Sequence, residues 1–427
     1  MTPIKKEKIF YGWIIVFASI IVTSVGIGVY ASTNTVFIKP ICDSLGFSRG
    51  EFTLHRTIIT LVGAFLMPLY AILLRKFKIK QILLVSAVFL FITTFSYSFA
   101  SQLWHFYVIA AINGLFLNGA HFMIVGVLVS RWFVDKKGFA TGLAYCGSGI
   151  GGAIMTPIAG QMVESMGWQW SFRTLAIIGL TILLPIVVLL IKESPESVGL
   201  KPYRNEKNTE SENTQQINIS GITFKQALRN STFWLLAIAF FFISILASGP
   251  MTHTIPFLTD IGYPLVFATS VFSFLMILLT IGKIGLGMVF DRFGALMGSI
   301  FVGICCITFP LLAMIASTPI IPWLYAMFFG LATVGFTVPV TVLVTKYFGS
   351  KDFATIFSVL SMITTFGSSI AVPFMGIIYD NTDSYNIAWI LLFIFAIIST
   401  FCLISAYFTS RKLIKKTVTI QTIDQAL

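Results

Sequence analysis

Charge is scarce in this sequence: Asp, Glu, Lys and Arg make up only 10% of its 427 residues, whereas 57% are hydrophobic. A water-soluble globule needs more polar surface than this to cover itself. The shortage therefore excludes a soluble globular protein and indicates a chain that is solvated by lipid. A membrane-spanning helix needs about 20 mostly apolar residues, and such runs recur from Tyr11 almost to the C-terminus.

Cysteine is also scarce, and its pattern excludes a disulfide or metal framework. Cys42 stands alone in an expected short loop, and the other four of the five cysteines fall inside apolar runs, where a small hydrophobic side chain fits. The sequence contains no nucleotide-binding loop, nucleophile motif or set of metal-ligand residues. We therefore expect no cofactor, no metal, no catalytic residue and no enzymatic activity.

Acidic residues are few: the chain has 16, against 28 basic ones, which gives a formal charge of +12. In a soluble protein this balance would suggest nucleic acid as a partner. Here the basic residues lie mostly in short segments between apolar runs, as the positive-inside rule expects. We therefore predict a multi-pass protein of the cell membrane (plasma or inner) with both termini cytoplasmic and no nucleic-acid partner. The first apolar run, from about Tyr11 to Thr35, is too long for a signal-peptide core, so we expect it to stay in the protein.

Hydropathy and loop signals predict an all-α membrane protein with about 12 transmembrane helices in two pseudo-symmetric six-helix bundles. The expected spans lie near 11–35, 52–74, 80–100, 104–130, 138–163, 171–191, 232–257, 264–290, 295–316, 321–345, 353–379 and 386–409.

A long polar stretch separates the two halves. It contains KPYRNEKNTESENTQQ, a composition typical of a flexible linker. We predict an N-terminal six-helix bundle, a cytoplasmic linker, and a C-terminal six-helix bundle with a cytoplasmic tail, at 1–191, 192–231 and 232–427.

The halves repeat each other. RWF at 131–133, followed by FAT at 139–141, reappears as KYF at 346–348, followed by FAT at 353–355. Parallel repeats of this kind imply a central cavity between two bundles, with substrate near the membrane midplane.

Several motifs resemble a known transporter family. GMVFDRFG at 287–294 resembles the second-half copy of the major facilitator loop signature, whereas the first-half copy, at 71–78, departs from it. FYGWIIV at 10–16, FIKPICDSLGFSRGEF at 37–52 and RWFVDKKGFATGLAYCGSGIGG at 131–152 resemble oxalate/formate antiporters and the related monocarboxylate transporters. The resemblance implies a secondary transporter of small organic anions that works by alternating access. It also implies a gating role for Gly287, Asp291 and Arg292.

Lys283 is the first candidate for substrate binding. It stands where the resembled family places an arginine that meets a substrate carboxylate, and the second lysine that oxalate transporters carry in the eleventh helix is missing here. That difference favours a monocarboxylate over oxalate. A charge inside a helix costs roughly 2.5–3.5 kcal/mol on insertion scales, and the 16 acidic residues fall in expected loops or near helix ends. Snorkelling or pairing with a carboxylate is the alternative to an anion site.

The other candidate binding residues are polar groups inside expected spans. Arg56 and Thr60 are four residues apart and share a helix face, although Arg56 could instead snorkel to the surface. Asn118 and His121 share a face of the fourth span and could bind a carboxylate or pass a proton, or could only bond a neighbouring helix. Asn34 and Thr337 could line the same path, although threonine commonly bonds its own helix backbone.

The segment GSGIGGAIMTPIAG at 147–160 resembles a glycine-proline signature of antiporters. Its Gly151 and Pro157 would permit close helix approach and bending, and packing alone would also explain them.

Other functions on the same kind of chain stay open. A proton-coupled exporter of drugs or other solutes normally needs a buried acidic residue, and a membrane sensor would need a soluble module. We expect a monomer in the lipid bilayer that binds a small organic anion and is coupled to protons or to a counter-anion.

Overall fold

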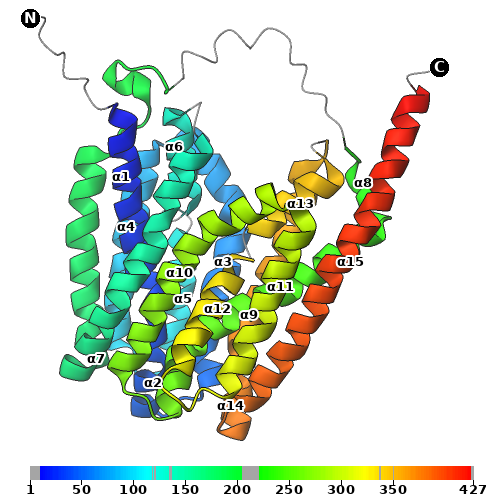
Figure 1. The fold of residues 1–427 in the computed structure, drawn as a ribbon. Helices are drawn as coiled ribbons and strands as arrows, with labels where there is room; N and C mark the ends of the chain where they lie inside the picture. Colours follow the sequence, from blue (N-terminus) through cyan, green and yellow to red (C-terminus); the bar gives the residue numbers. More distant parts are fainter. Residues whose placement is uncertain are drawn as a thin grey trace, which may run out of the picture. The chain divides into compact units, whose positions relative to one another are not determined.

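The structure is a computed structural model that describes residues 10–117, 119, 122–133, 137–203, 221–335, 338–349 and 351–424. Helices account for nearly all of these residues (Figure 1). Within the described ranges, β pairing is limited to two isolated bridges, Phe133–Tyr203 and Gly221–Gly349.

The helices of the first half follow one another with short connections. Their bounds are α1 Tyr11–Thr23, the π-helix η1 Ser24–Ser32, α2 Asn34–Leu45, α3 Arg49–Lys76, α4 Ile79–Ser96, the 3₁₀ turn η2 Tyr97–Phe99, α5 Leu103–Leu117, α6 Phe122–Trp132 and α7 Lys137–Leu190.

The later helices begin with two short ones inside the expected linker. Their bounds are η4 Pro195–Val198, α8 Phe224–Leu228, α9 Ser231–Asp260, α10 Leu265–Arg292, α11 Gly294–Met314, α12 Ile321–Val334, α13 Val338–Phe348, α14 Phe353–Thr382 and α15 Asn386–Asp424.

The described helices match the expected spans in order and differ in detail. Eight helical runs are long and apolar enough to cross a membrane, and two shorter apolar helices accompany them. The expected spans 138–163 and 171–191 form the single helix α7, which is interrupted at Gly167, where φ is 76°. The expected spans 104–130 and 321–345 each correspond to two helices, α5 with α6 and α12 with α13.

The first span was predicted too short. The helical run continues from Tyr11 to Leu45, through Pro40, and ends where Gly46 adopts a left-handed conformation with φ 71°. Cys42 therefore lies buried in α2, and the expectation of a loop at that position was wrong.

The chain forms two compact units. The first comprises Met1–Asn34 and Leu61–Thr214, and the second comprises Thr35–Thr60 and Gln215–Leu427. Residues 35–60, which are α2 and the first part of α3, thus pack with the second unit. The division at a 192–231 linker stays a prediction, because residues 204–220 lie outside the described part of the chain.

In the first unit α7 packs on α1, η1 and α4. The contact is close because glycines lie in it: a Cβ added at Gly28 would overlap the backbone of Gly151. Hydroxyl groups bond across the same contact, Thr23 to the carbonyl of Ala144 at 2.7 Å and Ser24 to the carbonyl of Gly147 at 2.8 Å. Small residues and hydroxyls of this kind hold helices together in lipid.

In the second unit α9 packs on α14 and α15, and α11 packs on α12 and α15 (Figure 1). Large rings fill the interior, among them Phe240, Tyr325 and Trp389. Large apolar side chains also face outward: Phe401 on α15 is 68% exposed and Phe366 on α14 is 59% exposed. Apolar side chains inside and outside fit a bundle surrounded by lipid.

Candidate functional site

Helix α3 brings two arginines to the second unit. Arg49 is its first residue, and Arg56 follows seven residues later. Seven residues are nearly two turns, so the two side chains leave the same helix face about 10 Å apart along the axis. Each arginine belongs to a separate polar group within the second unit.

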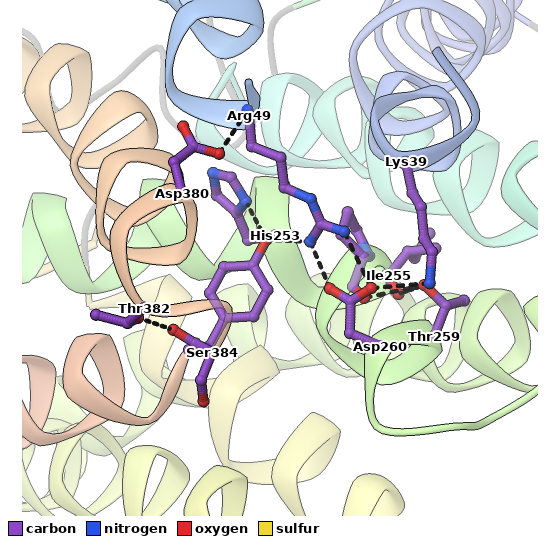
Figure 2. A network of polar contacts seen from close by, with 11 residues as sticks. Lys39, Arg49, His253, Ile255, Thr259, Asp260, Asp380, Thr382 and Ser384 are labelled. Carbon is purple, nitrogen blue, oxygen red and sulfur yellow. Dashed lines mark hydrogen bonds and ion pairs between the residues drawn. The ribbon is translucent and has the colours of Figure 1, made fainter. Parts of the chain in front are cut away.

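Arg49 is the centre of the first group, which we call the Arg49 cluster: Lys39, Arg49, His253, Asp260, Asp380 and Tyr385 (Figure 2). The Arg49 guanidinium binds both carboxylate oxygens of Asp260 at the end of α9, one of them through Nη2 at 3.0 Å. It also lies 3.8 Å from the centroid of the Tyr379 ring. A two-point bond together with ring stacking fixes the orientation of the guanidinium.

Asp260 binds a second cation. Lys39 Nζ lies 2.8 Å from its Oδ1. The side chain of Lys39 is 34% exposed, whereas those of Asp260 and Arg49 are 14% and 6% exposed. The Arg49–Asp260 pair is therefore the desolvated one, and Lys39 is its solvated neighbour.

Asp380 binds the start of α3. Its carboxylate accepts the backbone N–H groups of Arg49 at 2.7 Å and Gly50 at 2.6 Å. These are donors that a helix start leaves without intrahelical partners, and a negative charge is favoured there. The close approach of α14 to the start of α3 depends on glycine, because a Cβ on Gly376 of α14 would lie 2.8 Å from Cα of Gly50.

A hydrogen-bond chain extends from Arg49 into the unit. Its Nη1 donates to the Tyr385 hydroxyl at 2.8 Å, this oxygen lies 3.0 Å from His253 Nδ1, and His253 Nε2 lies 2.9 Å from the Val372 carbonyl. The Val372 carbonyl only accepts, so His253 carries a proton on Nε2. Burial beside the charged Arg49 favours the neutral imidazole, in which Nδ1 accepts from the Tyr385 hydroxyl.

Arg49 and Tyr385 both stay protonated, for different reasons. Burial opposes the charge on Arg49, but the hydrogen bond that it donates to Asp260 and the neighbouring charges outweigh burial and raise the pKa of the guanidinium. Burial raises the pKa of the Tyr385 phenol well above its usual value. Tyr385 therefore keeps the proton that it donates to His253.

Arg56 belongs to the second polar group, a cavity of about 140 Å³ that we call the Arg56 cavity. Its lining residues come from α3, α9 and α14, and they are Arg56, Thr57, Thr60, Ser248, Met251, Thr252, Ser368, Ser369 and Val372. Val372 also ends the hydrogen-bond chain from Arg49, so the cavity and the Arg49 cluster share a wall.

Proline explains one contact in this wall. Pro373 of α14 has no N–H, so the carbonyl of Ser369, four residues earlier, lacks its helical partner. The Thr57 hydroxyl of α3 donates to this carbonyl at 2.7 Å. A proline in α14 thus gives α3 a specific docking point.

The structure brings two of the predicted binding residues, Arg56 and Thr60, to one cavity. Lys283 is half-buried in α10 and contacts its surroundings, but it does not line the Arg56 cavity. Asn34 begins α2 and is buried, and its Nδ2 has no hydrogen-bond partner among the described residues. Asn118, His121 and Thr337 lie outside the described residues.

The predicted gating residues lie on α7 and α10. Gly151 packs against Ser24 and Gly28, and Pro157 lies inside α7. Arg292 ends α10, exposed, 5.6 Å from the ring of Phe293. The surroundings of Gly287 and of the Asp291 side chain are not among the parts that the structure describes. Close by, Lys346 Nζ donates to the carbonyl of Phe290 at 2.9 Å, a favoured place for a cation at a helix end.

Sequence reasoning missed the Arg49 cluster. It did not single out Lys39, Arg49, His253, Asp260 or Tyr385. A signal was present, because a histidine inside the apolar run of α9 is expensive in lipid and needs partners.

Comparison with known proteins agrees with this architecture. The profile of the Major Facilitator Superfamily matches residues 12–341. Monocarboxylate transporter 12 of Xenopus laevis is 23% identical over 317 residues, which are 69% of this chain and 66% of that protein. The glycerol-3-phosphate transporter of Bacillus subtilis (strain 168) is 24% identical over 241 residues, 53% of each chain. This chain spans less than two thirds of the length of these relatives.

Among solved structures, a bacterial homolog of the human lysosomal transporter Spinster, in an inward-facing and occupied conformation, superposes with a TM-score of 0.74 at 14% identity. The match covers 94% of this chain and 98% of that one. The likeness is one of fold, and it confirms the predicted all-α membrane architecture of two six-helix bundles. Because the family profile covers most of the chain and the fold agrees with it, the protein belongs to the major facilitator superfamily of multi-pass membrane transporters.

Proposed function

We propose that the protein is a secondary active transporter of small organic anions, a monocarboxylate or related carboxylate, and that it works by alternating access. The observation that supports this most is the Arg56 cavity, which places a cation beside hydroxyl groups in a small space. Among the described residues, those that line the cavity include no Asp or Glu. A site with one cation and no carboxylate favours an anionic substrate.

The two carboxylates of the neighbouring Arg49 cluster have other roles. Asp260 is bound by Arg49 and Lys39, and Asp380 accepts two backbone N–H groups. This argues against the alternative, a proton-coupled exporter of drugs or other solutes, which needs a buried acidic residue that can bind a proton or a cation. A membrane sensor is supported less, because the family is one of transporters.

Two further observations agree with an anion. Lys283 is a further basic side chain of the second unit, half-buried in α10 about 13 Å before the helix end at Arg292. The names of the relatives compared above also refer to anions, a monocarboxylate in one and glycerol 3-phosphate in the other.

Uptake by purified protein in liposomes tests the proposal. Labelled lactate, formate, oxalate and larger carboxylates are supplied outside, while the pH gradient and the internal anion are varied independently. We expect uptake of at least one small carboxylate, driven by one of the two gradients. Uptake of a cation, or of no carboxylate under any gradient, would contradict the proposal.

We place the protein in the cell membrane, plasma or inner, with both termini cytoplasmic and as a monomer. The basic segments between the helices support this orientation. Protease added to sealed right-side-out vesicles should then leave the segment near 200–220 intact. Cleavage there would contradict the proposed orientation.

A further inference from the structure

Five of the six hydroxyl groups that line the Arg56 cavity have already used their protons; the sixth belongs to Ser248. Each of the five donates to a backbone carbonyl, which can only accept, so the direction of each bond is fixed. The five bonds run from Thr57 to Ser369 (2.7 Å), Thr60 to Arg56 (3.0 Å), Thr252 to Ser248 (3.2 Å), Ser368 to Thr364 (2.9 Å) and Ser369 to Thr365 (2.8 Å). These five oxygens can offer a bound molecule only lone pairs.

Proline adds a further acceptor to the same wall. Pro256 lies inside α9 and has no N–H, so the carbonyl of Thr252, four residues earlier, is released from the helix ladder. Thr252 lines the cavity. This wall is therefore rich in acceptors, whereas the guanidinium of Arg56 can only donate.

The two kinds of group need complementary groups on one ligand. An anion fits the guanidinium, and an O–H or N–H donor fits the oxygens of α9 and α14. A volume of about 140 Å³ is small beside the roughly 300–1,000 Å³ of typical ligand pockets. In so small a space the donor must lie close to the anion.

We propose that the Arg56 cavity selects small carboxylates that carry a hydrogen-bond donor on the carbon next to the carboxylate, such as 2-hydroxy acids. This deepens the proposed function and rests on it. Simple carboxylates of the same size leave the acceptor wall without a donor, and a second carboxylate group would face oxygen lone pairs. A site built to bond a substrate hydroxyl discriminates strongly against the analogue that lacks it.

Paired ligands of matched size test the proposal. Uptake and binding are measured for glycolate against acetate and for lactate against propionate, with purified protein in liposomes. We expect the hydroxylated member to be preferred by about tenfold or more in each pair. Glycine and alanine form a third arm, which distinguishes an ammonium donor from a hydroxyl donor.

Variants of the wall locate the selectivity. Thr252→Val and Ser368→Ala each remove one acceptor oxygen with little change of shape, and both should lower the glycolate-to-acetate ratio. Thr308→Val is the matched control, because Thr308 makes the same bond to the carbonyl four residues earlier on α11, outside the cavity. Its ratio should equal that of the wild type.

The outcomes separate the two proposals. Equal uptake of glycolate and acetate by the wild type would overturn the selectivity and leave the transport of anions standing. A preference that survives Thr252→Val and Ser368→Ala in folded protein would place the selecting group elsewhere and overturn the assignment to this wall. Uptake of no carboxylate would overturn the proposed function itself.

Discussion

The hydroxyl of Tyr385 lies 3.0 Å from Nδ1 of His253, and both side chains are buried. The same oxygen accepts from Arg49, so one phenol satisfies two groups that have no access to water. Tyr385 precedes α15 directly, whereas His253 is on α9 and Arg49 begins α3. One hydroxyl thus joins three helices that are far apart in the sequence.

Removing this hydroxyl should therefore destabilise the protein. Tyr385→Phe leaves His253 Nδ1 and one N–H of Arg49 without this partner, and a buried polar group left without a partner costs about 1–3 kcal/mol. Thermal and denaturant unfolding in detergent would measure the loss. Tyr263→Phe is the control: Tyr263 is half-buried and makes one bond, 3.0 Å to the carbonyl of Ala316. A loss no larger for Tyr385→Phe than for Tyr263→Phe would refute the role of the chain.

The two cations on Asp260 should differ in their contribution to stability. Asp260→Asn leaves the buried charge of Arg49 without its carboxylate, and breaking a buried pair in this way costs about 3–5 kcal/mol. Lys39→Ala removes a partner that is 34% exposed, for which a loss of at most about 1 kcal/mol is typical. The measurement is the midpoint of unfolding for each variant. Similar losses in the two variants would show that the Arg49 pair is not the dominant one.

Close packing of α3 on α14 predicts a steric effect. Gly376→Ala places a Cβ 2.8 Å from Cα and N of Gly50, both backbone atoms that cannot move aside easily. We expect a loss of about 1–3 kcal/mol, as for other overpacked contacts. Gly285→Ala on α10 is the control, since a Cβ there meets nothing within 4 Å, and alanine favours a helix by about 1 kcal/mol over glycine. Unchanged stability of Gly376→Ala would mean that the two helices separate readily.

Lys283 should affect transport more than folding. Lys283→Gln keeps the length of the side chain and removes the charge, so we expect a large loss of anion affinity in a protein that is still inserted in the membrane. Lys283→Arg should retain part of the affinity, although a planar guanidinium requires a different geometry from an ammonium. Binding is measured together with thermal stability. Wild-type uptake by folded Lys283→Gln would remove Lys283 from the substrate site and leave the Arg56 cavity to be tested alone.

The sequence by itself determined that lipid solvates this chain, that its helices follow a twelve-span pattern in two halves, and that it resembles major facilitator transporters. Hydropathy is a local property, so each apolar run can be recognised from its own residues alone. Helix ends were less accurate, because Pro40 did not end a helix and Gly46 did.

Tertiary structure decided which charges are paired and which line a cavity. Arg49, His253, Asp260, Asp380 and Tyr385 meet only because α3, α9, α14 and the start of α15 pack at specific faces. Lys39 and Arg49 look alike in the sequence, as basic residues near helix ends. Burial separates them, since one is a third exposed and the other is nearly enclosed. The pairing of helix faces depends on contacts between residues that are hundreds of positions apart. Local composition cannot predict such contacts.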